Sequence, residues 1–220
     1  MGRRPLLRSL DISSALSLSP SHFRTIKHIE NNAFPQTERI ADQLKQFINQ
    51  SNQNKLLLAT LTQHNKTQSH HHHNLGNTQT QSLEHDNLVG FLLFSKIDAN
   101  TALINKIAVE THSRRCGIGT AMLKRAIHDL QTSRRQRAKQ MQVMLHVDPA
   151  RYGARRMYAQ MGFRECEQLS GYYPPEPGEE DAAPRDAIVM RYSIDSSLPT
   201  QYDFLTSGTN VSAGDVYLRA

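Results

Sequence analysis

The chain has 220 residues and a formal net charge of +6 at pH 7, and hydrophobic residues make up 38% of it. This length and composition suit one core of about 150 residues with tails, and they argue against two domains with separate cores. No stretch approaches the roughly eighteen apolar residues of a membrane-spanning helix. Cys116 and Cys166 have neither metal-ligand spacing nor a disulfide framework, so we expect a cytoplasmic protein without a membrane partner.

The positive balance fits a nucleic acid, the ribosome or an anionic cofactor as partner, or solubility alone. Its densest cluster ends a predicted helix, where the helix dipole favours cations; it consists of Arg134, Arg135, Arg137 and Lys139. Few aromatic residues interleave this cluster, so we do not expect a stacking platform for nucleic acid. Near the N-terminus, Arg8 and Asp11 interrupt any apolar run and Leu6 departs from the myristoylation pattern, so neither a signal peptide nor a lipid anchor is expected.

Three segments differ in composition from the rest of the chain. We expect a flexible N-terminus at 1–10, a flexible tail at 195–220 and a disordered polar insert at 63–86, because these segments cannot bury enough apolar surface to fold. A single domain over 11–194 remains. The insert contains four consecutive histidines, His70–His73. Such a run can bind a divalent metal, but we interpret it as low-complexity sequence and predict no metal site.

The first half of the domain predicts a strand at 11–18 and a helix at 20–32 that starts with Pro20. A second helix is expected at 37–49 with Thr37 as its N-cap, because apolar residues recur there every three or four positions, namely Ile40, Leu44, Phe47 and Ile48. Strands follow at 55–61 and 88–96, and the polar insert joins them as a long hairpin loop.

The second half predicts a strand at 102–109, a long helix at 117–138 and a strand at 141–147. A short helix at 151–161 is closed by Gly162, a typical left-handed C-terminal residue. Strands at 163–169 and 187–194 complete the domain. The order β-α-α-β-β-β-α-β-α-β-β indicates a layered α/β domain, which defines a fold class but not a function.

A glycine-containing loop connects the strand ending Ile107-Ala108-Val109 to the long helix. It reads Arg114-Arg115-Cys116-Gly117-Ile118-Gly119-Thr120. Free N–H groups and the dipole at a helix N-terminus favour an anion, glycines let it come close, and arginines add charge. The loop lacks the Gly-Lys-Ser/Thr of a P-loop, and Met122 replaces the third glycine of a dinucleotide fingerprint. It is therefore either a pyrophosphate-binding loop or an ordinary helix start with exposed arginines.

The pattern Arg-x-x-Gly-x-Gly between a strand and a helix resembles the acetyl-CoA loop of the GNAT acetyltransferase superfamily. A second segment resembles the family's strand–helix segment, with Leu145-His146-Val147, Ala154, Met157-Tyr158 and Gly162-Phe163 in that order. The resemblance covers about residues 20–194 and implies a GNAT fold, with a mixed, mostly antiparallel, splayed sheet flanked by helices. It implies acetyl-CoA as cosubstrate, bound by Ile107, Ala108, Val109, Arg114, Arg115, Cys116, Gly117, Ile118, Gly119, Thr120, Arg151, Ala154 and Tyr158.

A narrower resemblance rests on Phe34-Pro35 and on Gly171-Tyr172-Tyr173. Both features are similar to eukaryotic N-terminal acetyltransferases of the NatE and NatF type, and closest to the NatE catalytic subunit. This implies acetylation of protein N-termini that begin with Met, in a groove formed by Phe34, Pro35, Glu38, Asn105, Tyr172 and Tyr173. It also implies other acetyltransferase subunits and the ribosome as partners. The tail at 195–220 has one Arg and no basic amphipathic helix, which disfavours a membrane-associated NatF type.

The same resemblance places a catalytic histidine at His146, which relays the amine proton through water, and an acid at Tyr158, which protonates the leaving thiolate. Backbone N–H groups at Ile107–Val109 are candidate oxyanion donors. Three residues depart from the narrower pattern: Leu103 replaces a catalytic tyrosine, Arg151 stands where the helix after His146 usually opens with Asn, and Glu38 stands near the position of an aromatic residue. Two alternatives therefore stay open, namely a GNAT enzyme acting on lysine or small amines, and a weakly active or inactive ribosome-associated scaffold subunit.

Overall fold

The computed structural model describes residues 8–49, 53–63, 87–133, 140–179 and 181–195. Residues 1–7, 64–86 and 196–220 lie outside this described part, so the predictions of flexible ends and a disordered insert, including His70–His73, stay predictions. The basic cluster Arg134, Arg135, Arg137 and Lys139 also lies outside it. Within the described residues, no helix is long and apolar enough to cross a membrane, and no group of His, Cys, Asp and Glu side chains is arranged to hold a metal ion.

Seven strands form one sheet in the order β1-β2-β3-β4-β5-β7-β6. Every neighbouring pair is antiparallel except β4 and β5, which are parallel. The predicted mixed, mostly antiparallel α/β fold is thereby confirmed. The strands are β1 (Arg8–Ala15), β2 (Asn54–Gln63), β3 (Leu88–Lys96), β4 (Thr101–Val109), β5 (Gln140–Val147), β6 (Arg164–Tyr173) and β7 (Arg185–Asp195).

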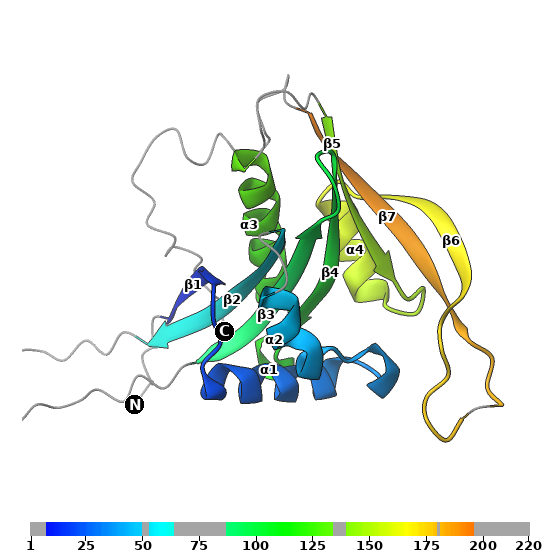
Figure 1. The fold of residues 1–220 in the computed structure, drawn as a ribbon, viewed down its shortest axis with the longest axis horizontal. Coiled ribbons are helices and arrows are strands. Elements are labelled where there is room, and N and C mark those ends of the chain that lie inside the picture. The colour runs from blue at the N-terminus through cyan, green and yellow to red at the C-terminus, as the bar shows by residue number, and fades with distance from the viewer. Residues whose placement is uncertain (1–7, 50–52, 64–86, 134–139, 180, 196–220) are drawn as a thin grey trace, which may run out of the picture.

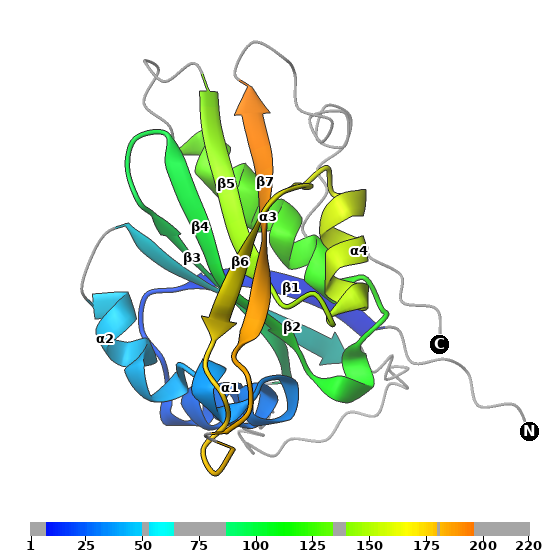
Figure 2. The same ribbon diagram turned by 90° about the vertical axis from the view of Figure 1, so that its right-hand side faces the viewer.

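Helices cover both faces of the sheet (Figures 1 and 2). On one face α1 (Pro20–Ala33) and α2 (Leu44–Asn49) pack against apolar side chains of β2 and β3. On the other face α3 (Ile118–Thr132) and α4 (Tyr152–Gln160) contribute to the larger core cluster. The alternation of side chains along a strand explains this division, because it sends consecutive residues of β2 and β3 to opposite layers.

The predicted helix at 37–49 is wrong in its first half. That segment forms two short 3₁₀ turns, Gln36–Glu38 and Ala41–Gln43, before α2 begins at Leu44. The physical reason is Glu30 of α1, which is fully buried and accepts hydrogen bonds from the N–H groups of Ile40 and Ala41 at 2.8 and 2.7 Å. A carboxylate from another helix thus binds the amides that a continuous helix would have used, and Thr37 does not act as a helix cap.

The other differences concern element ends. The first strand begins at Arg8, inside the segment expected to be flexible, and ends at Ala15. Helix α3 ends at Thr132, earlier than the expected 138, where the hydroxyl of Ser133 donates to the carbonyl of Asp129 at 2.6 Å. Strand β6 continues to Tyr173, four residues beyond the expected end. That extension carries the hairpin of β6 and β7 past the edge of the sheet (Figure 1).

Candidate active site

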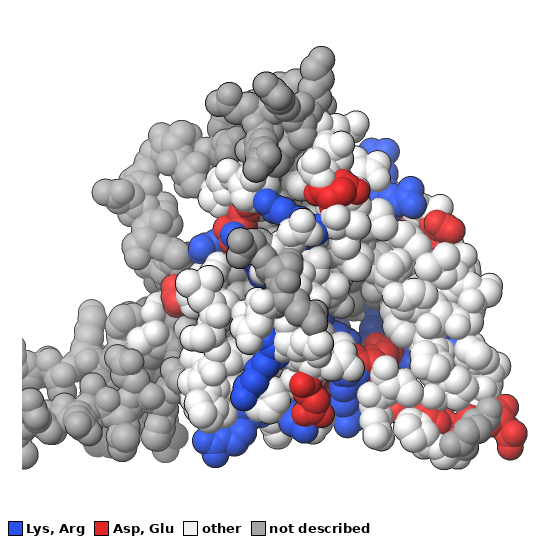
Figure 3. Space-filling model, viewed as in Figure 1, with Lys and Arg blue, Asp and Glu red and all other residues white. Residues whose placement is uncertain are grey.

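A deep cleft opens where β4 and β5 separate. The two strands pair only from Thr101 to Ile104 on β4 and from Gln142 to Leu145 on β5, and the remaining residues of β4 diverge from β5. The cleft has a volume of about 1210 Å³, above the roughly 300–1,000 Å³ of ordinary single-ligand pockets. It therefore has room for two substrates. Figure 3 shows the surface hollowed between the body of the sheet and the side formed by β6 and β7.

Nearly all residues that the sequence nominated for a site line this one cleft. Its lining includes the residues predicted to bind the cofactor, namely 107–109, Arg114, Arg115, 117–120, Arg151, Ala154 and Tyr158. It also includes the predicted substrate-binding and catalytic residues Phe34, Glu38, Asn105, His146, Tyr172 and Tyr173. Two nominated residues are not among its lining. The thiol of Cys116 contacts the carbonyl oxygen of Arg114 at 3.5 Å, and Pro35 precedes the first 3₁₀ turn.

A β-bulge at Asn105 coincides with the point where the strands separate. Leu93 of β3 pairs with Lys106 and Phe94 pairs with Ile104, so Asn105 is the extra residue of β4. A bulge bends and twists its strand locally and shifts the alternation of side chains by one. Before the bulge Ile104 packs in the core cluster beside α3, whereas after it Ala108 packs with the cluster beside α1. The bulge thus turns Lys106 toward the α1 side.

The loop before α3 leaves the first amides of that helix open toward the cleft. Arg115 and Gly117 have φ angles of 65° and 77°, and Gly117 caps α3 without any side-chain hydrogen bond. The guanidinium of Arg114 donates through Nε to the carbonyl of Val109 at 2.9 Å, which fixes the loop against the end of β4. A helix N-terminus with free N–H groups, flanked by two arginines, has the charge and geometry of a pyrophosphate site.

Gly117 provides a test of this loop. Gly117→Ala is expected to lower the free energy of unfolding by about 1–2 kcal/mol, because a side chain at positive φ is strained. Gly153→Ala is the matched control: Gly153 lies inside α4 at no positive φ and with open space around it, so alanine should stabilise the protein by about 0.5–1 kcal/mol. Denaturant unfolding of both variants measures the difference, and equal effects would contradict a strained loop.

His146 lies near the end of β5 with its ring against the β6–β7 hairpin. Its Nδ1 and the hydroxyl of Tyr172 are 3.1 Å apart, and the two ring centroids are separated by 4.8 Å. Tyr172 in turn contacts Tyr173 edge to face at 4.9 Å. Burial lowers the pKa of His146, an effect opposed by the charge of Glu167. A half-buried histidine that is neutral near pH 7 can accept a proton.

Tyr158 of α4 is buried beneath the cleft and packs against Phe163 at a centroid distance of 5.9 Å. Burial raises the pKa of its hydroxyl well above the ordinary value, and the charge of Arg151 opposes this only in part. Tyr158 therefore stays protonated at all physiological pH values. Such a group can donate a proton to a leaving atom but does not act as a resting base.

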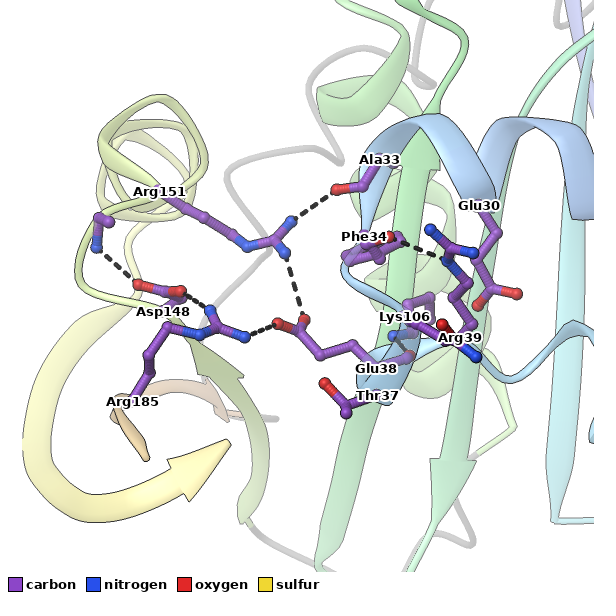
Figure 4. A network of polar contacts seen from close by, with 12 residues as sticks. Glu30, Ala33, Phe34, Thr37, Glu38, Arg39, Lys106, Asp148, Arg151 and Arg185 are labelled. Atoms are coloured by element: carbon purple, nitrogen blue, oxygen red, sulfur yellow. Dashed lines mark hydrogen bonds and ion pairs between the residues drawn. The ribbon is translucent and has the colours of Figure 1, made fainter. Parts of the chain in front are cut away.

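A network of charged side chains occupies the other end of the cleft (Figure 4). The carboxylate of Glu38 accepts from Arg151 at 3.2 Å and from Arg185 at 2.8 Å. Arg185 also pairs with Asp148, and Arg151 donates to the carbonyl of Ala33 at 3.1 Å. Glu38 therefore joins the α1 side of the cleft to β7 and to the start of α4. The resemblance implied that Arg151 binds the cofactor, but its guanidinium contacts Glu38 and the carbonyl of Ala33. We call this end of the cleft, lined by Phe34, Glu38 and Arg151, the acceptor end.

A second contact closes the same end. Glu176, in the loop between β6 and β7, accepts from the backbone N–H of Gln36 at 2.7 Å and from the hydroxyl of Thr37 at 2.6 Å. These hydrogen bonds hold the turn after α1 against the β6–β7 loop. Gln36 and Glu176 are 140 residues apart in the chain. Thr37 and Pro174, one from each of these two segments, line the cleft.

Sequence reasoning missed four residues here, namely Lys106, Asp148, Glu176 and Arg185. Glu176 belongs to a loop whose only sequence signal was its proline and acidic content, and Arg185 begins β7 directly after that loop. Both residues contact the turn after α1, and such long-range contacts carry no local signal. Lys106 would have required knowledge of the bulge at Asn105. Asp148 carried a local signal, because it directly follows the strand that bears His146.

Comparison with known proteins adds a family match and a set of similar folds. A model of the acetyltransferase (GNAT) family matches residues 38–163. No curated protein matches the sequence. Among solved structures, the ribosomal-protein-S18-alanine N-acetyltransferase of Escherichia coli has a TM-score of 0.57 and 23% identity, over 87% of this chain and 97% of that one.

Two further structures show how widely this fold is shared. NAA60 of Arabidopsis thaliana in complex with acetyl-CoA has a TM-score of 0.59 and 17% identity, over 84% of this chain and 98% of that one. The spermidine/spermine N-acetyltransferase SpeG of Vibrio cholerae, in complex with manganese ions, has a TM-score of 0.55 and 16% identity, over 91% of this chain and 98% of that one. At such identities the likeness concerns the fold alone.

Proposed function

The chain belongs to the acetyltransferase (GNAT) family, and from this premise we propose that it acetylates the α-amine of protein N-termini that begin with Met. As a family member it is an acetyl-CoA-dependent acetyltransferase. The narrower assignment is to the NatE type of N-terminal acetyltransferase. Other subunits of such a complex and the ribosome are the partners that this assignment predicts.

One observation carries the proposal: the acceptor end of the cleft is closed over by two loops that hold each other. Glu176 binds the turn at Gln36 and Thr37, and Glu38 binds Arg185. An N-terminal amine enters such an opening with a single chain direction behind it, whereas a lysine within a folded segment reaches in with its side chain while the main chain on both sides of it meets the two joined loops. The arrangement therefore favours a free N-terminus as the acceptor.

The second substrate binds at the opposite end. The open amides of α3, with Arg114 and Arg115 beside them, suit the pyrophosphate of acetyl-CoA. Acetyl-CoA supplies the thioester carbonyl. Where β4 leaves β5, backbone N–H groups of Ile107–Val109 on that side of the strand are available to stabilise negative charge on the carbonyl oxygen.

The residues between the two ends can move the protons. A peptide α-amine has a pKa of about 7.7–8.0, so a substantial neutral fraction exists near pH 7.4, whereas only about 0.1% of a lysine is neutral. The amine nitrogen bonds to the carbonyl carbon, the carbon–sulfur bond breaks, and the amine loses a proton. His146 takes that proton through water and Tyr158 donates one to the leaving thiolate, so no covalent acetyl-enzyme is required.

Tyr172 contacts Nδ1 of His146, and the direction of this hydrogen bond decides which nitrogen is the base. If Nδ1–H donates to the Tyr172 oxygen, then Nε2 carries the free lone pair and accepts the proton. Leu103, in the position of the family's tyrosine, lines the cleft and has no proton to transfer. Its presence is the specific feature that favours the second candidate function, a weakly active scaffold subunit.

A peptide assay tests the proposed function. The purified protein is incubated with acetyl-CoA and Met-starting peptides whose N-termini are free or blocked, and thiol release is followed. We expect turnover only with free N-termini. Turnover of blocked peptides that contain lysine would instead favour the lysine enzyme, and acetyl-CoA binding without turnover of any amine would favour the scaffold.

A further inference from the structure

Lys106 lies at the acceptor end of the cleft, which we also call the acceptor groove. Unlike Arg151 and Arg185, it pairs with no carboxylate among the described residues. Arg151 and Arg185 each form ion pairs with Glu38, and Arg185 also pairs with Asp148. The ammonium of Lys106 donates instead to the backbone carbonyl of Glu38 and lies 4.1 Å from the centroid of the Phe34 ring. A neutral carbonyl and an aromatic face leave the charge of this side chain uncompensated by direct contact.

We propose that Lys106 is the specificity-determining residue of this groove and selects N-termini in which Met is followed by an acidic residue. The inference rests on the proposed function, because it concerns the acceptor of the same reaction. It adds the charge of the second substrate residue, which the sequence alone left open.

The fold delivers Lys106 to this place through the bulge at Asn105. Without the extra residue, the alternation of β4 would send residue 106 to the same face as Ile104, in the layer beside α3. With it, Lys106 faces the turn after α1 and lines the cleft on the same side of β4 as Leu103. An acceptor peptide held between that turn and the β6–β7 loop must pass this ammonium.

Lys106 is partly buried, so its ammonium is poorly hydrated and a nearby negative charge would stabilise it. Desolvation lowers the pKa of Lys106, while the charges of Glu30 and Glu38 raise it and that of Arg151 lowers it further. Both carboxylates are already engaged, Glu30 with two backbone amides and Glu38 with two arginines. An ammonium has three donor hydrogens, so a carboxylate of the bound peptide can form a charge-assisted hydrogen bond that the protein does not supply.

The Phe34 ring supports the same conclusion. The ammonium of Lys106 and the guanidinium of Arg151 both lie over this ring, the latter at 4.7 Å from its centroid. The surface beside Phe34 is therefore cationic as well as aromatic. A basic second residue would meet like charge there, whereas an acidic one would meet opposite charge.

Matched peptides isolate the charge from the shape. Peptides beginning Met-Glu and Met-Gln differ by one charge at constant size, and both kcat/KM and the dissociation constant in the presence of coenzyme A are measured. We expect the wild type to prefer Met-Glu by about tenfold, since a hydrogen bond to a charged group is worth about that much. Lys106→Met should bring this ratio close to one, Lys106→Arg should retain most of it, and Lys45→Met, on the exposed side of α2, should not change it.

The two measurements separate this inference from the proposed function. Selective binding of Met-Glu without turnover would remove the N-terminal acetyltransferase activity but leave the role of Lys106 intact. Equal affinity of the wild type for both peptides, no binding of either, or an unchanged ratio in Lys106→Met would overturn the inference.

Discussion

Replacing His146 by alanine is expected to lower kcat at pH 7.5 by about 10²–10³-fold, because a positioned general base contributes roughly 10²–10⁴-fold. His146 lies in the cleft where β4 and β5 separate, between the open amides of α3 and the closed acceptor end. Steady-state thiol release at saturating substrates measures the change. The KM for acetyl-CoA should change little, because the cofactor loop lies on another element.

The pH dependence of kcat tests the role of His146 as general base independently. Burial lowers the pKa of His146 from the ordinary 6.5, so the free base persists as the pH falls through neutrality. In the wild type the acid limb of kcat should therefore have its midpoint below 6.5. In His146→Ala this limb should disappear, whereas a mere loss of packing would lower the rate without changing the profile.

Tyr172→Phe tests whether the Tyr172 hydroxyl fixes the tautomer of His146. It removes the oxygen that lies 3.1 Å from Nδ1 but leaves the aromatic ring against the imidazole. We expect a smaller loss of kcat, about tenfold, together with a shifted acid limb, since about 1.5 kcal/mol, the lower end of the range for a hydrogen bond to a charged group, corresponds to this factor. An undiminished rate in His146→Ala would remove His146 from the mechanism whatever Tyr172 does.

Local signals were sufficient for most of the fold. A continuous apolar run predicted β3 at 88–96 with its observed ends, and Gly162 with a φ of 91° closes α4 as predicted. The order of elements followed from the same patterns. Where prediction failed, a group outside the predicted element had intervened: the carboxylate of Glu30, on the preceding helix, binds the amides of Ile40 and Ala41 and divides the expected helix at 37–49.

The residues of the candidate site likewise fall into those with a local sequence signal and those without one. The loop before α3 and His146 each carry a local motif and could be named from the sequence. Lys106 could not, since one unpaired residue in β4 decides which face it occupies. The partners of Glu38 were equally hidden, because Arg185 lies 147 residues further along the chain. An acidic residue at position 38 indicated an altered substrate contact, whereas the structure engages its carboxylate with two arginines.

Replacing Glu38 by alanine is expected to lower the free energy of unfolding by about 2–4 kcal/mol. Removing one partner of a buried ion pair costs about 3–5 kcal/mol, and the figure here is reduced because the arginine side chains are 28% and 37% exposed, compared with 7% for Glu38. Arg151 would keep the carbonyl of Ala33 and Arg185 would keep Asp148. Glu38→Gln, which preserves size, should cost less than alanine.

The matched control is Glu165→Ala, which removes an ion pair with Arg155 at 2.8 Å in which the carboxylate side chain is 46% exposed. Exposed pairs contribute about 0–1 kcal/mol, so this variant should unfold almost like the wild type.

Because Glu38 joins the turn after α1 to β7, its loss should also raise the KM for peptide by about tenfold, since a mispositioned acceptor loses orientation. The affinity for acetyl-CoA should stay unchanged. Equal stability losses in the two variants, or a weakened acetyl-CoA site in Glu38→Ala, would show that the network does not hold the acceptor end of the cleft.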